Sequence, residues 1–192
     1  MKLLATTCIA GLVVGLGASV ATADEFEPAL KDLAESRIRA MVSDPAIVAA
    51  ITAQNAKFGG MSEAEIVALD NKWRAEIGSG STPTIDQVLN GAVADLLRVY
   101  RDDSAGLFTE IFIMDNVGLN VAASDTTSDY WQGDEAKWQQ SYAVGADGLH
   151  ISGVELDEST QTYQVQVSVS ITDGSGAAIG AATFGVNVEN LQ

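Results

Sequence analysis

The sequence predicts an α+β fold, with helices in its first part and an antiparallel sheet in its second part. As far as residue 107, apolar residues recur three and four positions apart, a spacing typical of amphipathic helices. From Phe108 onward, apolar and polar residues tend to alternate, which is typical of half-buried strands. The last strands follow one another through short turns, so the sequence favours antiparallel pairing.

Residues 1–23 predict a secretory signal peptide. A basic Lys2 precedes an apolar run from Leu3 to Val20, and Ala21-Thr22-Ala23 then forms a small-x-small cleavage site. A retained membrane anchor is the alternative, which the short and glycine-rich run disfavours. We therefore expect cleavage after Ala23 and a protein secreted through the inner membrane into the periplasm.

The chain beyond Ala23 is strongly acidic and has no cysteine. It carries 9 Lys and Arg against 26 Asp and Glu, which is a net charge of −17. Such a charge disfavours nucleic acid and anionic lipid as partners, because both need basic patches. The absence of cysteine excludes a disulfide and a thiol nucleophile from this part of the sequence. We expect a soluble protein whose stability comes from one packed core.

Four helices are expected in the front part, residues 24–107. The second begins at Pro45, directly after the capping residue Asp44. The third begins at Ser62, which forms a capping box with Glu65. The expected ranges are 27–43, 45–58, 62–77 and 85–100, with a Gly/Ser connection over 78–83.

Residues 108–192 predict a sheet with a loop inserted in it. In the clearest strand, Val165 and Val167 belong to an apolar face, and Gln164 and Gln166 belong to a polar face. The apolar face is expected to pack against helices. The polar face is either solvated or a polar floor beneath the inserted loop. Strands are expected over 108–115, 119–124, 150–156, 161–172 and 179–188, with a short helix over 133–142 and a turn over 157–160.

The segment Asp115–Trp138 is the strongest candidate site, because it mixes aromatic residues with carboxylates. Flat apolar walls with a few polar groups are what a small-molecule pocket needs. The aromatic residues either fill a core over the sheet or line a pocket whose polar contacts come from Asp129, Gln132 and Asp134. Such a cage suits an amine or a quaternary ammonium. The aromatic residues are Tyr130, Trp131, Trp138 and Tyr142.

The sequence disfavours an enzyme. His150 is the only histidine, so a His-rich metal site is impossible and a Ser-His-Asp triad would need this residue. No serine stands in a nucleophile-elbow glycine pattern. We expect no catalytic residues, no metal and no cofactor. A hydrolase that uses His150 is the remaining enzymatic alternative.

Four motifs of the second part follow one another in a specific order and spacing. They are D-x-x-G-L-N-V-A-x-S from Asp115, T-S-D-Y-W-Q-G-D-E-A-K-W from Thr127, V-E-L-D-E-S-T-Q-T-Y-Q-V-Q-V-S from Val154, and I-G-A-x-x-F-G-V-N-V from Ile179. Together they resemble the extracytoplasmic sensor domains called Cache or PDC. The resemblance covers residues 108–190 well and the helical front in outline.

This resemblance implies a PAS-like fold, in which a five-stranded antiparallel sheet has a long N-terminal helix on one face and a ligand pocket on the other. Amino-acid-binding members carry an Arg in the aromatic loop, where this chain has Gln132 and Lys137, which disfavours amino-acid recognition of that kind. Together with Asp129, the residues implied as ligand contacts are Tyr130, Trp131, Trp138, Tyr142, Gln164, Gln166 and Asp173.

The resemblance also implies a role in signal transduction or chemotaxis. No membrane segment follows the last strand, so we expect a periplasmic binding protein that acts with a separate membrane-bound receptor or kinase. The alternative is a structural or assembly protein that binds no ligand. In that protein the aromatic cluster is core, and the front helix forms a homodimer or partner interface.

Overall fold

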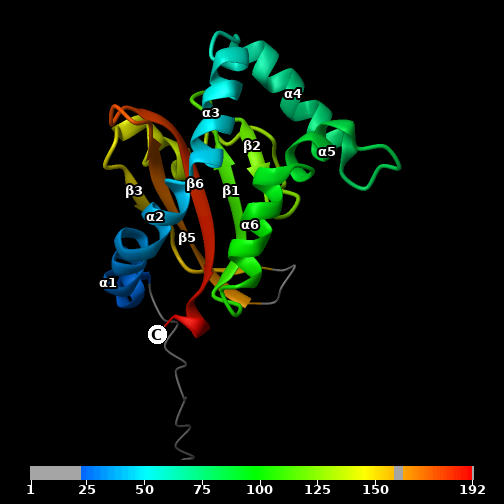
Figure 1. The fold of residues 1–192 in the computed structure, drawn as a ribbon. Coiled ribbons are helices and arrows are strands. Elements are labelled where there is room, and N and C mark those ends of the chain that lie inside the picture. The colour runs from blue at the N-terminus through cyan, green and yellow to red at the C-terminus, as the bar shows by residue number, and fades with distance from the viewer. Residues whose placement is uncertain (1–22, 158–161, 192) are drawn as a thin grey trace, which may run out of the picture.

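The computed structural model describes residues 23–157 and 162–191, and its centre is one antiparallel sheet (Figure 1). The predicted α+β class and antiparallel pairing are confirmed. Across the sheet, the strands lie in the order β2 (Asn120–Ala123), β1 (Phe108–Met114), β6 (Ala178–Asn187), β5 (Thr162–Thr172) and β3 (Leu149–Ile151), and β4 (Glu155–Asp157) also pairs with β5.

The described part of the sheet has six strands, because the strand expected over residues 150–156 is divided in two. β3 pairs with the middle of β5, where Leu149 lies opposite Val169. β4 pairs with the start of β5, where Leu156 lies opposite Tyr163. Between them, Ser152 still donates its backbone N–H to the Gln166 carbonyl at 2.9 Å. The predicted turn over 157–160 lies largely outside the described residues.

Helices dominate the described residues before β1, as predicted. The sequence signals at two of their starts are realised, because Asp44 accepts the Ala46 N–H and both hydrogen bonds of the Ser62–Glu65 capping box form. Among the described helices, none is both long and apolar enough to cross a bilayer. The helices are α1 (Ala23–Leu33), a π-helical turn (Ala34–Ile38), α2 (Arg39–Val42), α3 (Pro45–Phe58), α4 (Glu63–Glu76), α5 (Pro83–Leu89) and α6 (Ala92–Asp102).

The single helix expected over residues 85–100 is wrong, because the chain forms α5 and α6 there. The break falls at Asn90-Gly91, which are both poor helix formers. Arg98 of α6 donates to the Leu89 carbonyl at 2.9 Å and so satisfies the end of α5. The apolar residues on each side of the break continue the same spacing, which is why the pattern alone does not reveal it.

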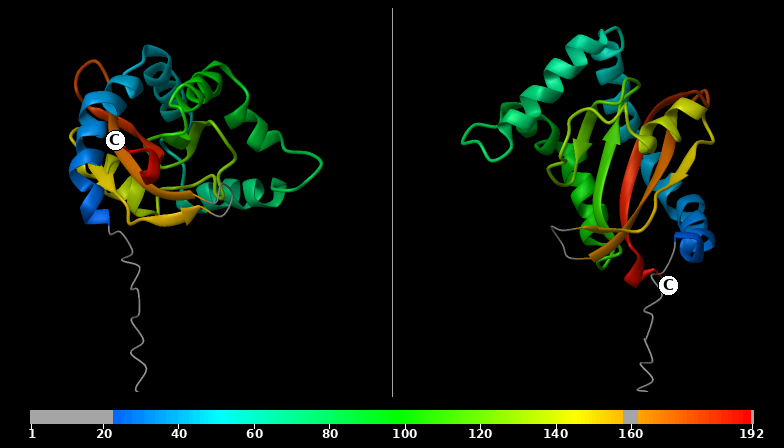
Figure 2. Two further views of the ribbon diagram at one scale, coloured as in Figure 1. Left: turned by 90° about the horizontal axis from the view of Figure 1, so that it is seen from below. Right: turned by 180° about the vertical axis from the view of Figure 1, so that it is seen from behind.

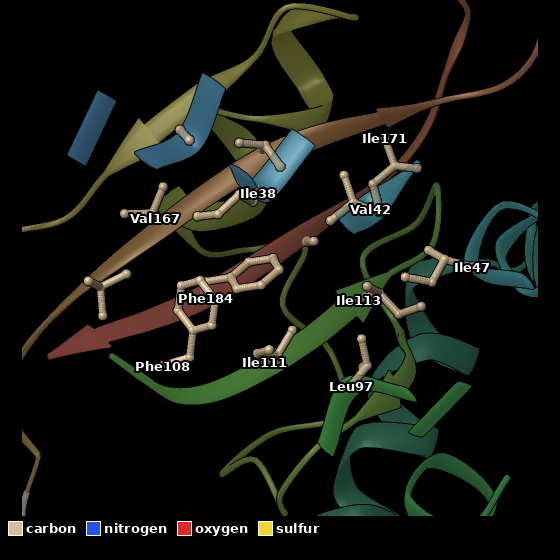
Figure 3. Packing of buried hydrophobic residues seen from close by; sticks show 14 of the residues in the cluster. Ile38, Val42, Ile47, Leu97, Phe108, Ile111, Ile113, Val167, Ile171 and Phe184 are labelled. Carbon is tan, nitrogen blue, oxygen red and sulfur yellow. The ribbon is translucent and has the colours of Figure 1, made fainter. Parts of the chain in front are cut away.

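One face of the sheet packs against α1, α2, α3 and α6 and forms the main apolar core (Figures 1 and 3). Val167 and Ile171 of β5 point into this core, as the alternation of the strand predicts. Phe184 of β6 meets Phe108 edge to face, with ring centroids 5.0 Å apart. Tyr163 departs from the pattern, since 51% of it is exposed beside β4.

The opposite face of the sheet, seen from behind in Figure 2, is covered by a different layer. A second apolar cluster joins Phe112 and Met114 of β1 to Trp73 of α4 and Tyr130 of the inserted loop. That loop contains α7 (Ala136–Gln139) and a 3₁₀ turn (Tyr142–Val144), which replace the longer helix expected over 133–142. The polar row of β5 lies on this same face.

Candidate functional site: a polar hollow between the sheet and the inserted loop

A hollow of about 420 Å³ lies between the second face of the sheet and the inserted loop. Its floor comes from β1 and β5, and its wall comes from the loop after β2 and from α7. We call it the polar hollow, because Phe112 is the only apolar residue among the described residues that line it. It is lined by Thr109, Glu110, Phe112, Asp125, Thr126, Thr127, Ser128, Gln132, Lys137, Gln164 and Gln166.

The floor is built from side chains that meet across β6. Thr109 donates its hydroxyl to Gln164 Oε1 at 2.5 Å, and Gln166 donates its amide to Glu110 Oε1 at 3.1 Å. These bonds join β1 to β5, which are not neighbours, because β6 lies between them. Between them, β6 has Gly185, and the absence of a side chain there leaves room for these two hydrogen bonds. A Cβ added at Gly185 would lie 2.3 Å from Thr109 Oγ1.

Gln132 forms part of the wall and is 1% exposed. Its amide nitrogen donates to the Asp129 carbonyl at 2.9 Å, and its backbone N–H donates to the Gly118 carbonyl at 2.7 Å. Its side-chain oxygen Oε1 is buried and has no partner among the described residues. A buried acceptor without a partner costs about 1–3 kcal/mol, so this oxygen is a candidate acceptor for a donor from outside the chain.

Helix α4 holds the wall in place through a carboxylate. Asp70 Oδ1 accepts the backbone N–H groups of Tyr130 at 2.8 Å and Trp131 at 3.1 Å. Arg74, one turn further along the helix, donates to Asp70 Oδ2 at 2.7 Å and also pairs with Asp129 at 2.5 Å. Because Asp70 is itself buried, these bonds fix the loop backbone against the helix.

The structure places Tyr130 and Trp131 in packing contacts beside the hollow. Tyr130 is 6% exposed and stacks on Trp73 with ring centroids 5.4 Å apart. Burial, together with the nearby charge of Asp115, raises the pKa of Tyr130 to about 12, so the phenol stays neutral. The indole N–H of Trp131 donates to the Val117 carbonyl at 2.9 Å.

Trp138 and Tyr142 form a second aromatic pair. They share one face of the loop, as their spacing predicts, with ring centroids 5.0 Å apart. The indole of Trp138 donates to the backbone carbonyl of Asp115 at 3.1 Å, in the turn between β1 and β2. Both rings pack against the cluster that contains Phe112 and Met114.

The charged groups that line the hollow have protein partners. Asp125 pairs with Arg101 at 2.5 Å. Lys137 pairs with Glu135 at 3.0 Å, and its ammonium lies 5.4 Å from the centre of the Phe112 ring. Glu110 accepts the Gln166 amide, as described above.

Asp173 lies apart from these lining residues, and Asp129 contacts them without lining the hollow itself. Asp173 is in the turn after β5, at the opposite end of that strand from Gln164. Hydrogen bonds from the Ser175 hydroxyl and from backbone N–H groups of the turn lower the pKa of Asp173. Asp129 is in the wall loop, where its carboxylate pairs with Arg74. Of the sequence-predicted residues, Gln132, Gln164 and Gln166 line the hollow directly, and the four aromatic residues pack in the loop that forms its wall.

His150 lies on β3, where Nδ1 contacts the Gln140 side-chain oxygen at 3.1 Å. Burial is the main reason that its pKa is lowered, and the charge of Lys137 adds to this effect. Among the described residues, no group of three or more His, Cys, Asp and Glu side chains is arranged to hold a metal ion.

Sequence reasoning missed Thr109, Glu110 and Phe112 as lining residues. A charged Glu110 inside a largely apolar strand was the available signal. It lies two residues before Phe112, so both belong to the face that carries the hollow. Their meeting with Gln164 and Gln166 depends on β6 lying between β1 and β5, and this strand order cannot be read from the alternation within one strand.

Comparisons with known proteins give matches in structure only. No protein-family model matches the chain, and no curated protein matches it. The matching solved structures include the ligand-binding domain of the Campylobacter jejuni chemoreceptor Tlp3 in complex with 4-methylisoleucine, at 13% identity and a TM-score of 0.40. They also include the sensor domain of the V. cholerae histidine kinase DctB, at 9% and 0.39, and the ligand-binding domain of the Pseudomonas fluorescens chemoreceptor CtaA in complex with L-alanine, at 14% and 0.39.

These matched structures are sensor and ligand-binding domains. They are the class of domain that the sequence resemblance predicts. The three matches cover 87%, 87% and 67% of the present chain and 62%, 59% and 52% of the Tlp3, DctB and CtaA chains. The chain therefore spans less than two thirds of the length of each.

Proposed function

We propose that this chain is a periplasmic, sensor-type domain that binds a small molecule and acts with a separate membrane-bound receptor or kinase. The polar hollow is its ligand site. Residues 24–192 form one domain in this proposal, with the helices before residue 108 and the sheet after it. The proposal includes no catalytic step.

The observation that carries this proposal is the unpartnered Oε1 of Gln132 in the wall of the hollow. Proteins rarely bury a side-chain acceptor without a donor, and a bound ligand is one way of supplying it. The hollow has a volume of about 420 Å³, which lies in the range of small-molecule pockets. Polar side chains converge on it from two strands and a loop, so a ligand held there has several directional contacts.

In this proposal, Gln164 and Gln166 contact the ligand from the floor, and Gln132 contacts it from the wall. Tyr130, Trp131, Trp138 and Tyr142 hold the wall, together with Asp129 through its pair with Arg74. Ligand binding stabilises one arrangement of this loop, and the partner recognises that arrangement. Asp173 stabilises its own turn and lies outside the proposed contact set.

A second candidate is a structural or assembly protein, and the packing of the aromatic loop favours it. Tyr130 stacks on Trp73, and both Trp131 and Trp138 donate their indole N–H groups to backbone carbonyls. Side chains used in this way form a core. In this second proposal, the N-terminal helix forms a homodimer or partner interface and the hollow contains only water.

A thermal-shift screen of small metabolites separates the two candidates. A ligand that binds only the native state raises the melting temperature. The proposal expects at least one compound to do so, and expects Gln166→Leu to remove the shift. The matched control is Gln87→Leu, because Gln87 is exposed on α5, and it should keep the shift. A stabilising compound that acts equally on both variants would place the ligand elsewhere.

Export is tested separately by mass spectrometry of the protein from the periplasmic fraction. Cleavage after Ala23 gives a chain that begins at Asp24. A full-length chain in the membrane fraction would instead favour a retained anchor. Neither result depends on the ligand screen.

A further inference from the structure

We propose that the ligand of the polar hollow is a neutral, polyhydroxylated small molecule, such as a monosaccharide or a polyol. This inference rests on the proposed function and names the ligand class for the same site. Three properties of the hollow support it: its charged groups are paired, the one aromatic residue of its described lining already lies beside an ammonium group, and its amides can both donate and accept hydrogen bonds.

The charges around the hollow disfavour a charged ligand. Asp125 is paired with Arg101, and Lys137 is paired with Glu135. Glu110 is hydrogen-bonded by Gln166. A charged ligand that displaced one of these partners would leave the displaced group without its compensating charge. A neutral ligand leaves all of these contacts intact.

The described lining of the hollow also offers no free ring face for a flat ligand or for a cation. Phe112 is the one aromatic residue among those that line it, and the Lys137 ammonium lies 5.4 Å from its ring centre. The ring of Tyr130 is already stacked on Trp73. An aromatic ligand would find no stacking partner, and a quaternary ammonium would meet the positive charge of Lys137.

The side-chain amides of Gln132 and Gln164 supply both a hydrogen-bond acceptor and a hydrogen-bond donor. Gln132 presents a buried Oε1 that can only accept. Gln164 accepts from Thr109 through Oε1, so its amide N–H₂ group is the part available to donate. A hydroxyl group donates and accepts at one atom, so a molecule with several adjacent hydroxyls satisfies both glutamines together. Carboxylates cannot donate to Gln132, and alkylammonium groups cannot accept from Gln164.

The test compares two panels by isothermal titration calorimetry on the purified protein. The neutral panel contains glucose, galactose, ribose, mannitol and myo-inositol. The charged panel contains amino acids, dicarboxylates, diamines and choline. Low millimolar concentrations are used, because concentrated sugars stabilise most proteins by exclusion from their surface. We expect measurable binding in the neutral panel and none in the charged panel.

Two variants tie the binding to the hollow. Gln132→Met and Gln164→Met each remove an amide at nearly constant volume and should weaken binding about tenfold. Gln87→Met on the exposed side of α5 is the matched control and should bind as the parent does. Circular dichroism and melting curves check that each variant is folded, and Gln164→Met covers the case in which Gln132→Met unfolds.

The outcomes test the ligand class separately from the proposed ligand-binding function. Neutral binders that are lost in both hollow variants support the ligand class. A charged binder that is lost in the same variants overturns the ligand class and leaves the proposed function standing. Binding that neither variant weakens overturns the hollow as the site, and the absence of binders in both panels counts against both proposals.

Discussion

At the scale of single residues, Asp70 is the side chain on which the wall of the hollow most depends. It accepts two backbone N–H groups, those of Tyr130 and Trp131, from a loop sixty residues away in sequence. Removing the carboxylate leaves a buried Tyr130 N–H without an acceptor and also breaks the contact with Arg74. We expect Asp70→Ala to lower the free energy of unfolding by about 2–4 kcal/mol, as measured by urea denaturation.

The matched control for this prediction is Asp32→Ala, because Asp32 is exposed on α1. We expect it to change the free energy of unfolding by less than about 0.5 kcal/mol. Equal losses in the two variants would mean that the carboxylate of Asp70 adds nothing beyond general surface charge.

His150 can report on the electrostatics beside the hollow, because it is the only histidine in the sequence. Burial first, and then Lys137, hold its pKa below 6.5 in the folded protein. The unfolded chain therefore takes up the proton first as the pH falls, so this group lowers the stability as the pH drops below 6.5. We expect Lys137→Met to raise the pKa of His150 in an NMR titration of the imidazole. The control is Lys57→Met, at an exposed position, which should leave the pKa of His150 unaltered. If Lys137→Met also left this pKa unaltered, burial would be its sole cause.

At the scale of elements, two glycines bring the turn between β1 and β2 against the wall loop. Gly118 has a φ of +87°, and a Cβ added there would lie 2.4 Å from Gly133 Cα. Since neither backbone can retreat without breaking the Gln132–Gly118 hydrogen bond, we expect Gly118→Ala to cost about 2–4 kcal/mol of unfolding free energy.

The control for this prediction is Gly174→Ala, where an added Cβ meets nothing within 4 Å. Chemical denaturation of both variants gives the comparison. If Gly118→Ala is as stable as Gly174→Ala, the contact between the two loops adapts and does not hold Gln132 in place.

The same elements show how far the sequence determines the structure. The predicted strand 161–172 differs from β5 by one residue at its start. The prediction succeeds because apolar and polar residues alternate clearly along this strand. The split between α5 and α6 is missed, because the apolar spacing runs on through Asn90-Gly91 and outweighs the poor helix propensity of these two residues. The strand expected over 150–156 is missed in a similar way, because its two halves pair with separate stretches of β5.

The candidate site is predicted in part for a physical reason. Gln164 and Gln166 are recognisable because amides on one face of a strand are unusual beside a valine face. The aromatic residues attract notice by composition, but composition cannot tell a pocket wall from a core. That distinction depends on Trp73 and Asp70 of α4, which reach the loop from a distant part of the chain.

At the scale of the whole molecule, the two faces of the sheet have different chemistry. One face is closed by aliphatic residues from four helices and by Phe108 and Phe184. The other carries a polar row that is bridged across Gly185 and enclosed by a hydrogen-bonded loop. The larger apolar core therefore lies on the first face, and on the second face a smaller apolar cluster around Trp73 and Phe112 lies beside the polar row.

The acidity of the chain gives the last prediction, which concerns its response to salt. The sequence carries 26 acidic against 10 basic residues, so negative charges repel one another over the folded surface. Raising NaCl from about 10 mM to about 200 mM shortens the screening length from roughly 30 Å to below 10 Å. We expect the free energy of unfolding to rise by about 1 kcal/mol over this range. The double variant Asp32→Asn/Asp103→Asn, which removes two exposed charges, should be more stable at low salt and should respond less. A free energy that falls as salt is added would mean that ion pairs such as Arg74–Asp129 outweigh the repulsion.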